Sequence, residues 1–175
     1  MALRRCKHRG FTAFELLAVV AVAAVLATIA VPSFSQLRRG VSIGASANQM
    51  LWALPYARSS AILRGLPTVL CLSADGSRCV TAGGTATTGW IVFHDRDRGS
   101  PVQLSAADEV LHRLSLPQNV TVSGTRAAVT YWPTTRAGTT STFKFCDAHG
   151  DPQGRSVIVS QTGRPRVAGA TSCAP

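Results

Sequence analysis

Residues 11–31 read Phe-Thr-Ala-Phe-Glu-Leu-Leu-Ala-Val-Val-Ala-Val-Ala-Ala-Val-Leu-Ala-Thr-Ile-Ala-Val and contain one charged side chain, Glu15. As an α-helix with a rise of about 1.5 Å per residue, this stretch spans about 30 Å, which is the thickness of the hydrocarbon core of a bilayer. Four basic residues lie among the first ten, and they predict that the segment before the helix stays in the cytoplasm. We therefore predict one membrane-spanning helix at the N-terminus.

Other N-terminal signals explain this segment less well. A secretory signal peptide has a shorter apolar region and a small-residue cleavage site, and no such site follows before Pro32. A lipoprotein signal fails because no apolar stretch precedes Cys6. An ordinary single-pass anchor leaves Glu15 unexplained, since a carboxylate inside a membrane helix costs about 2–3 kcal/mol or more and usually has a partner.

The start of the helix resembles the class III signal of type IV prepilins and type II secretion pseudopilins. The matching residues are Gly10, Phe11, Thr12 and Glu15, although aliphatic residues are usual at the positions of Ala13 and Phe14. The resemblance implies that a prepilin peptidase cleaves between Gly10 and Phe11 and that the new Phe11 amine is N-methylated. It also implies that Glu15 pairs with the Phe11 ammonium of a neighbouring subunit during assembly. A buried carboxylate becomes tolerable once a cation lies against it.

After the apolar run the chain predicts a helical extension. The helix is expected to continue past Pro32 with a kink, and to end at Gly65 and Pro67. Pro55 is awkward in a helix interior and should bend the helix or open a short break. The apolar face that would pack on a sheet is expected to consist of Phe34, Leu37, Val41, Leu51, Leu54, Ala57, Ala61 and Ile62.

From Leu66 onward the pattern changes to short β-type runs separated by turns. The expected strands are 68–73, 89–94, 110–114, 120–122, 127–132, 142–146, 156–161 and a short run at 165–167. A long helix followed by antiparallel strands is an α+β arrangement, which is that of the pilin fold. We divide the chain into a cleaved leader (1–10), a transmembrane and assembly helix (11–32), an amphipathic helix extension (33–64) and a β-rich globular domain (65–175).

Four of the five cysteines lie beyond the leader, at Cys71, Cys79, Cys146 and Cys173. Four cysteines can form two disulfides in three different connectivities. A turn signal, Asp75-Gly76, lies between Cys71 and Cys79, so a bridge across a small hairpin is geometrically reasonable there. Cys146 and Cys173 would then pair and fasten the C-terminus to the sheet. The alternative of four free thiols requires a cytosolic protein, and zinc is disfavoured by the spacing.

Motifs in the globular part resemble the GspH/FimT family of minor pilins and pseudopilins. They are Ala57-Arg58-Ser59-Ser60-Ala61, Pro67-Thr68-Val69-Leu70-Cys71, Gly89-Trp90-Ile91-Val92-Phe93 and Gly163-Arg164-Pro165-Arg166. One branch of the family, like GspH, serves type II secretion. The other, like FimT, belongs to type IV pili and includes members that bind DNA in natural transformation through a C-terminal G-R-x-R motif. The resemblance implies DNA binding here by Gly163, Arg164 and Arg166.

The chemistry of these arginines agrees with that reading. Beyond residue 10 the chain keeps 14 Lys and Arg against 8 Asp and Glu, and 13 of the 14 are arginine. Two arginines separated by one residue on an extended segment point the same way, roughly 6–7 Å apart, so they suit the phosphates of a nucleic acid backbone. Arg155 could extend the patch. The alternative is a solvated turn between edge strands, where arginine discourages aggregation.

No other motif predicts a site. Residues 94–99, His-Asp-Arg-Asp-Arg-Gly, have the look of a calcium loop, but they lack the further oxygen ligands and are interpreted as a polar turn. Residues 40–44 match G-x-S-x-G without the strand that should precede it. We therefore predict no enzyme, no cofactor and no metal site. A membrane-anchored enzyme with an unrecognised site is the remote third hypothesis.

Together with the apolar helix, the resemblance implies a minor pilin of the inner membrane with a periplasmic C-terminal domain, which enters a pilus or pseudopilus after assembly. The expected partners are other pilins or pseudopilins, the prepilin peptidase, the inner membrane and DNA. The FimT-like branch is favoured by the basic charge and by Gly163-Arg164-Pro165-Arg166, and the GspH-like branch is the alternative.

Overall fold

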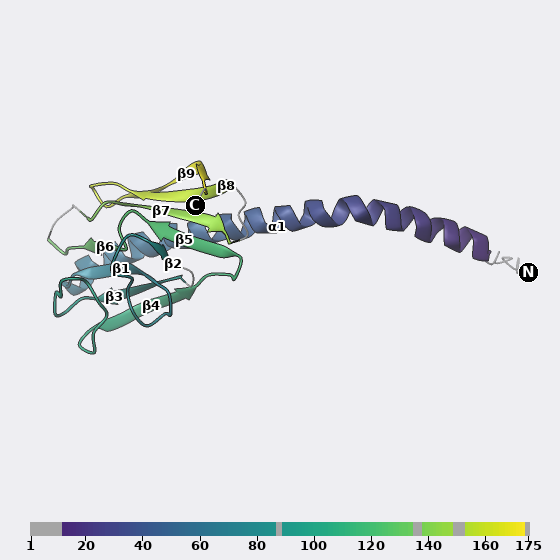
Figure 1. Ribbon diagram of the computed structural model, residues 1–175. Helices are drawn as coiled ribbons and strands as arrows, with labels where there is room; N and C mark the ends of the chain where they lie inside the picture. Colours follow the sequence, from purple (N-terminus) through teal and green to yellow (C-terminus); the bar gives the residue numbers. More distant parts are fainter. Residues whose placement is uncertain (1–11, 87–88, 135–137, 149–152, 174–175) are drawn as a thin grey trace, which may run out of the picture. The chain divides into compact units, whose positions relative to one another are not determined.

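The computed structural model describes residues 12–86, 89–134, 138–148 and 153–173. The chain forms two compact units, an N-terminal unit (Met1–Arg38) and a globular unit (Arg39–Pro175). Of the N-terminal unit, the structure describes the first part of a helix. The globular unit contains the rest of that helix and two antiparallel sheets (Figure 1).

The helix α1 (Ala13–Arg64) is 52 residues long. It continues past Pro32, as predicted, and ends where Gly65 takes a φ of 66°. The break considered at Pro55 does not occur. Pro55 lies on the exposed side of α1, so water can reach the carbonyl that loses its partner. Leu54 and Ala57, on either side of it in sequence, are fully buried and hold the helix on the sheets.

The buried face of α1 differs from the predicted one. Leu54, Ala57 and Ala61 are buried as expected, whereas Phe34, Leu37, Val41 and Ile62 are exposed. The face that packs on the sheets also includes Ile43, Ala47 and Met50, which the sequence analysis did not select. Two sets of apolar residues on one helix made the periodicity ambiguous, because each set by itself has near-helical spacing.

Within the residues that the structure describes, nine strands follow the helix. Their bounds are β1 (Thr68–Ser73), β2 (Thr85–Ala86), β3 (Gly89–His94), β4 (Glu109–Ser115), β5 (Val120–Gly124), β6 (Ala128–Tyr131), β7 (Ser141–Asp147), β8 (Gln153–Val159) and β9 (Pro165–Ser172). One sheet has the order β4-β3-β1-β6, and the other has the order β2-β5-β7-β8-β9. Every strand pairing in both sheets is antiparallel. We call these sheets A and B.

The α+β prediction is confirmed, and the eight predicted strands are all present. The ends of β1 and β3 agree with the prediction to the residue. The two-residue strand β2 is not among the predicted strands; it lies in a Gly- and Thr-rich stretch, and neither residue type favours a strand by itself as strongly as the apolar runs do. The arrangement in two sheets also depends on pairings between distant residues, which the local pattern does not encode.

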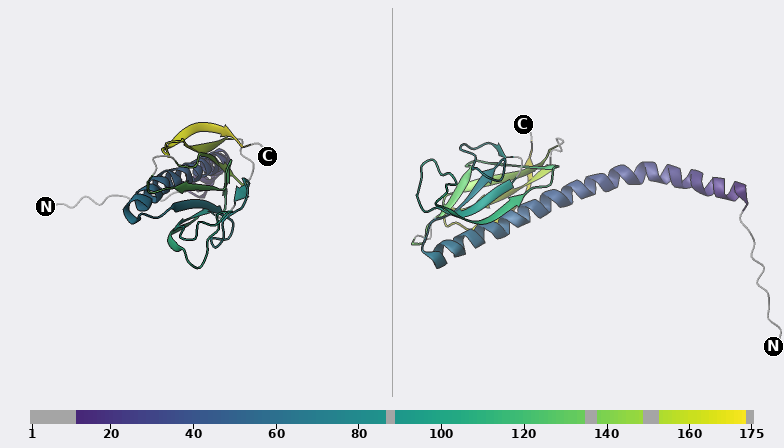
Figure 2. Two further views of the ribbon diagram at one scale, coloured as in Figure 1. Left: turned by 90° about the vertical axis from the view of Figure 1, so that its left-hand side faces the viewer. Right: turned by 90° about the horizontal axis from the view of Figure 1, so that it is seen from below.

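The main core lies between α1 and the two sheets, which run alongside the helix within the globular unit (Figure 2). Its largest side chains include Trp90 and Phe145, whose rings meet edge to face with centroids 6.2 Å apart. A smaller core covers the other face of sheet A and contains Val69, Ile91 and Phe93. Because β1 and β3 are buried on both faces, their sequences are apolar without alternation.

Candidate functional site

The N-terminal end of α1 is capped by Thr12, the residue directly before the helix. The Glu15 amide donates to Oγ1 of Thr12 at 3.3 Å, and the Leu16 amide donates to the Thr12 carbonyl at 3.2 Å. Thr12 is therefore the N-cap residue, and Glu15 stands at the glutamate position of a Thr-x-x-Glu capping box. The three-residue spacing of Thr12 and Glu15 in the sequence is the signal for this cap. Gly10 and Phe11, the predicted processing site, lie outside the described residues.

The first part of α1 has the length and composition of a membrane span. Ala13–Ala30 has a mean hydropathy of 2.4, and none of it is buried within the protein. Large apolar side chains such as Leu16, Val22 and Ile29 are more than half exposed. An 18-residue helix of this kind needs an apolar environment, which a bilayer or neighbouring apolar helices can provide.

The turn between β8 and β9 presents the arginines selected from the sequence. Ser160 organises it: its carbonyl accepts from the Gly163 amide at 2.8 Å, and its amide donates to the Arg164 carbonyl at 3.1 Å. The Arg164 amide donates to Oγ of Ser160 at 3.2 Å. The backbone before Arg164 is thus held by several hydrogen bonds within one short turn.

Side chains from β6 and α1 donate hydrogen bonds to the backbone of this turn. The hydroxyl of Tyr131 donates to the Gly163 carbonyl at 3.0 Å, and Nη1 of Arg58 donates to the Thr162 carbonyl at 3.0 Å. Burial raises the pKa of Tyr131, against the opposing effect of the Arg58 guanidinium, so the phenol stays a hydrogen-bond donor. Gly163 has a φ of 72°, a conformation that favours glycine. Its role is to shape the turn, since it carries no side chain to bind a ligand.

Arg164, directly before β9, and Arg166, the second residue of β9, are both exposed. Arg166 pairs with Ile158 of β8, and the next residue, Val167, pairs with the buried Val157 and packs against the core. Because successive side chains of a strand point to opposite faces, Arg166 lies on the outer face of sheet B. Arg164 precedes it by two residues and lies toward the same face.

Arg155 does not join this pair. It pairs with the buried Phe145, two residues from the pair of buried residues Phe143 and Val157, and so it belongs to the face of sheet B that meets α1. A methyl group placed on Gly44 of α1 would lie 3.6 Å from Nε of Arg155. By this register Arg155, although exposed, lies on the opposite face of sheet B from Arg166, so its placement does not support the prediction that it extends the patch.

Lys144 is a better candidate to extend the outer face. It is exposed on β7 and pairs with Ser156 of β8, and Ser156 pairs with Ala168 of β9. Ala168 lies two residues after Arg166 and therefore on the same face of the sheet. By this register Lys144 and Arg166 share the outer face. Alternation along residues 142–146 could have indicated that Lys144 faces outward, but only the strand pairing shows that β7 and β9 lie two strands apart.

Charge is unevenly distributed between the two sheets. Among the described residues of sheet B, Asp147 is the one acidic side chain in a strand, and it forms an ion pair with Arg39 at 3.5 Å. The other acidic residues of the described globular unit lie in β4 or in the loops next to sheet A: Asp75, Asp95, Asp97, Asp108 and Glu109. The outer face of sheet B is therefore the basic side of the unit.

The two disulfides are both present. Cys71–Cys79 closes a loop in which Oδ1 of Asp75 accepts from the amides of Ser77 and Arg78 at 2.8 and 2.9 Å. Hydrogen bonds from Ser77 hold the pKa of Asp75 well below its ordinary value. Cys146–Cys173 joins β7 to the end of β9. The second bridge fastens the strand that carries Arg166 to the centre of sheet B.

The aspartate-rich segment after β3 is a polar turn. The carboxylates of Asp95, Asp97 and Asp108 approach within 4.8 Å of one another, but they cap backbone amides. Asp95 accepts from the Arg98 amide at 2.7 Å, and Asp108 accepts from the amides of Arg96 and Ser105 at 2.9 and 2.8 Å. Burial raises the pKa of Asp95. These carboxylates therefore serve as hydrogen-bond acceptors for the backbone of the turn.

His94 forms a buried polar junction near the C-terminal end of α1. It is fully buried, with Nδ1 2.9 Å from Oγ1 of Thr68 and Nε2 3.4 Å from Oγ of Ser60. Burial lowers the pKa of His94; Arg64 and Arg96 act in the same direction, and Glu109 opposes them. The imidazole is therefore neutral in the folded protein near pH 7.

This junction predicts that the globular unit is less stable in acid. In the unfolded chain a histidine takes up its proton near pH 6.5, whereas folded His94 does so at lower pH, so the unfolded state binds more protons in that window. The free energy of unfolding should then decrease as the pH falls from about 7.5 to about 5.5. Urea unfolding at each pH measures this slope. His94→Gln should flatten it, and His112→Gln, at an exposed histidine, should not; equal slopes in all three proteins would contradict the prediction.

The fold defines a class of protein: a long helix with an apolar N-terminal part, packed through its second half on antiparallel sheets, is the pilin fold. Residues 46–163 match the family model described as "Type II transport protein GspH", which covers more than half of the chain. The chain therefore belongs to the GspH family, and it is a minor pilin or pseudopilin subunit with a structural rather than an enzymatic role.

Solved structures of two such proteins are similar to this chain. The type IV minor pilin FimU of Pseudomonas aeruginosa matches with a TM-score of 0.55 and 20% identity over 75% of this chain and 99% of FimU. The minor pseudopilin EpsH of the Vibrio cholerae type 2 secretion system matches with a TM-score of 0.52 and 14% identity over 73% of this chain and 97% of EpsH. At these identities the likeness establishes the fold alone. A search of curated protein sequences gave no match.

Proposed function

We propose that this subunit is a FimT-like minor pilin that binds DNA without reading its sequence, as part of DNA uptake in natural transformation. The observation that supports the proposal is the placement of Arg164 and Arg166. Both guanidinium groups are exposed on the outer face of sheet B, directly after a turn that hydrogen bonds and Tyr131 hold in place. A backbone held in this way loses less conformational entropy on binding than a loose loop does.

The geometry suits the backbone of a nucleic acid. Residues two apart on a strand lie roughly 6–7 Å apart, which is comparable to the distance between successive phosphates of one DNA strand. Contacts of this kind position a protein on DNA but carry no sequence information. Lys144 offers a further cation on the same face. Two or three such contacts support weak binding that is sensitive to salt.

The alternative is a GspH-like pseudopilin with a structural role in type II secretion. The description of the matching family model and the fold shared with EpsH both favour it. In that case Arg164 and Arg166 would be solvated residues at the edge strand β9, where charge prevents unwanted strand pairing.

Processing and membrane anchoring are proposals as well. We infer that residues 1–10 are a cleaved leader, that Phe11 becomes the methylated N-terminus and that the globular unit lies in the periplasm. The apolar helix Ala13–Ala30 supports an anchor in the inner membrane. Intact-mass analysis of the exported protein tests the first two points: a mass that begins at Phe11 with one added methyl group is expected, and retention of the leader would contradict them.

DNA binding can be tested with the purified full chain in nanodiscs of neutral lipid, by fluorescence anisotropy of a labelled DNA duplex at several salt concentrations. The variant Arg164→Gln/Arg166→Gln should lose at least about tenfold in affinity at low salt, and the slope of log K against log salt should fall in magnitude by about 2.

The matched control is Arg78→Gln/Arg113→Gln. It removes the same charge at two exposed arginines, in the loop that follows β1 and in β4 of sheet A, and should bind DNA within about twofold of the unchanged protein because electrostatic contacts act locally at moderate salt. If the unchanged protein fails to bind at low salt, or if the Arg164/Arg166 variant binds equally well, the DNA role of this site is wrong.

A further inference from the structure

An exposed tryptophan lies near the turn that presents the arginines. Trp132 directly follows the last residue of β6, and its side chain is 42% exposed. Among the residues that the structure describes, every other exposed large apolar side chain lies on α1. Trp90 and Tyr131, by contrast, are buried in the main core. A single exposed apolar residue is ordinary on a protein surface, so the surroundings of Trp132 decide whether it has a role.

Those surroundings are determined by a contact between the end of β6 and the turn between β8 and β9. The Tyr131 hydroxyl donates to the Gly163 carbonyl at 3.0 Å. Tyr131 also pairs with Gly138, and a methyl group placed on Gly138 would lie 3.4 Å from Cα of Gly163. In Figure 1 the end of β6 and this turn lie at the same end of the globular unit. Trp132 follows Tyr131 in the chain, and Arg164 follows Gly163. Because consecutive Cα atoms are about 3.8 Å apart, the tryptophan and the first arginine both lie next to this contact.

The indole and the arginines point away from the main core. The side chain of Tyr131 lies in that core, and neighbouring residues of an extended segment point to opposite sides, so Trp132 points outward from sheet A. Arg166 lies on the outer face of sheet B, since Val167 beside it packs against the core. The exposed surface at this end of the unit therefore combines one aromatic ring with two guanidinium groups.

This combination is typical of surfaces that bind single-stranded nucleic acids. Cationic groups contact the phosphates, and exposed aromatic rings stack on the bases whatever their sequence. In a duplex the bases are stacked on one another, and a protein reaches the face of a base only when the nucleotide leaves the stack. Phosphate contacts alone would favour the duplex, because each contact with a duplex releases more counterions than a contact with a single strand. A preference for single strands is therefore a sign of stacking.

We propose that Trp132 stacks on an unpaired base next to the phosphates that Arg164 and Arg166 contact, so that the site binds single-stranded DNA in preference to duplex DNA. The inference rests on the proposed function, because it assigns a class of DNA to the same surface. It adds a residue that lies outside the motif Gly163-Arg164-Pro165-Arg166, and a contact to a base rather than to the backbone.

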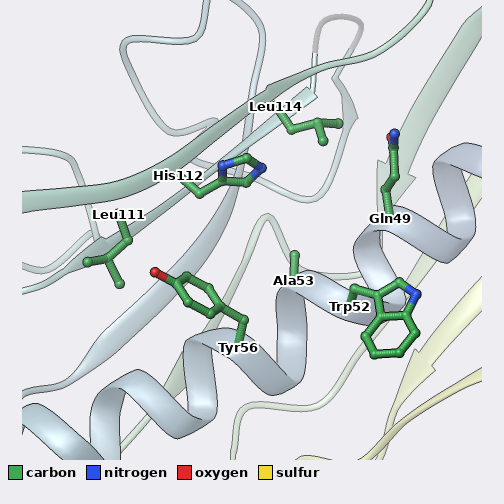
Figure 3. Close-up of a pocket in the computed structure, with 7 residues that line it drawn as sticks. All are labelled: Gln49, Trp52, Ala53, Tyr56, Leu111, His112 and Leu114. Atoms are coloured by element: carbon green, nitrogen blue, oxygen red, sulfur yellow. The ribbon is translucent and has the colours of Figure 1, made fainter.

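The other exposed tryptophan provides a matched control. Trp52 is 78% exposed on α1 and lines a pocket of about 380 Å³ between this helix and β4. Figure 3 shows Trp52 on α1 and the opposite wall of the pocket on β4. The described residues that line this pocket include no lysine or arginine. Replacing Trp52 therefore removes an exposed indole that has no cation beside it to hold a phosphate.

The test compares three labelled oligonucleotides of equal length: a single strand, the duplex of that strand with its complement, and a strand of abasic sites that keeps the phosphates. Each is mixed with the purified full chain in nanodiscs of neutral lipid, and affinity is measured by fluorescence anisotropy at low salt with empty nanodiscs as the blank. The single strand is expected to bind at least about fivefold more tightly than either the duplex or the abasic strand.

Variants assign this preference to one side chain. Trp132→Ala should lower affinity for the single strand at least about fivefold and leave affinity for the duplex within about twofold. The slope of log K against log salt should stay the same, because no charge is removed. Trp132→Phe should keep part of the preference, since a smaller ring can still stack, and Trp52→Ala should change neither affinity. Circular dichroism and urea unfolding check that each variant is folded. The comparison of the single strand with the abasic strand needs no variant.

The fluorescence of the indole gives an independent measurement. In a Trp52→Phe protein the tryptophan emission comes from Trp132 and from Trp90, which is buried. Stacking on a base should quench the emission of Trp132 when the single strand is added, and the abasic strand should leave it unchanged. Quenching that is equally strong with the abasic strand would contradict stacking.

Three results would overturn the proposal. The duplex or the abasic strand could bind as tightly as the single strand, Trp132→Ala could keep its affinity for the single strand, or Trp52→Ala could lose as much as Trp132→Ala. If Arg164→Gln/Arg166→Gln still weakens binding to the duplex in any of these cases, the DNA role of the arginines stands and only the stacking role is wrong. If the unchanged protein binds no form of DNA at low salt, both proposals are wrong.

Discussion

Replacing Gly163 with alanine is expected to destabilise the globular unit by about 2–4 kcal/mol and to weaken DNA binding, although every charge stays in place. Gly163 has a φ of 72°, which costs an alanine about 1–2 kcal/mol. The new Cβ would also lie 2.8 Å from Cε1 of Tyr131. Tyr131 is buried and cannot move aside easily, so the turn must shift, and Arg164 and Arg166 would shift with it.

Two controls separate the turn from general damage to the sheet. Gly169→Ala changes a glycine of β9, the strand that follows the turn, where an added Cβ has no neighbour within 4 Å, so it should be nearly neutral. Tyr131→Phe removes the hydrogen bond to the Gly163 carbonyl and should cost about 1 kcal/mol. Urea unfolding gives the stabilities, and anisotropy of labelled DNA gives the affinities. A Gly163→Ala protein as stable as the Gly169→Ala protein would refute the role assigned to this glycine.

The sequence was sufficient to locate the helix and most strands, but it did not show which face of a strand or helix each side chain occupies. Strands such as β1 and β3 were located to the residue, because turn residues bound short apolar runs. The face on which Arg155 lies was not accessible in the same way. It depends on pairing with Phe145 and on an irregularity between Gly154 and Ser156 that changes the register with β9. A shift of one residue moves a side chain to the other face.

The same limit applies to the helix and to the site. On α1, the buried residue Met50 and the exposed residue Trp52 belong to two apolar stripes, and only packing on the sheets shows which of them forms the core. Lys144 could not be connected with Arg166 before the order β7-β8-β9 was known. The motif Gly163-Arg164-Pro165-Arg166 was found because its residues are adjacent in sequence, so this part of the candidate site was accessible from the start.

Replacing Glu15 with valine is expected to lower incorporation into filaments at least about tenfold and to leave insertion into the membrane intact. Glu15 is the single charged residue of α1 before Arg38. As a membrane residue it is costly, by about 2–3 kcal/mol or more without a partner, so valine should insert at least as well. If Glu15 pairs with the ammonium of Phe11 in a neighbouring subunit, valine leaves that cation without its partner, and an unpaired buried charge costs several kcal/mol.

The experiment compares the amount of protein in the membrane fraction with the amount in sheared filaments, by immunoblot, for the unchanged protein and three variants. Glu15→Gln keeps the shape of the side chain and removes the charge, so it should also assemble poorly. Thr28→Val makes a similar polar-to-apolar change later in the same helix, where the Thr28 hydroxyl only donates to the Val25 carbonyl at 2.7 Å, and should assemble normally. Normal assembly of Glu15→Val would mean that Glu15 does not hold the Phe11 amine. If Thr28→Val also assembled poorly, a structural requirement of the whole helix would explain both results. The carboxylate of Glu15 would then have no special role.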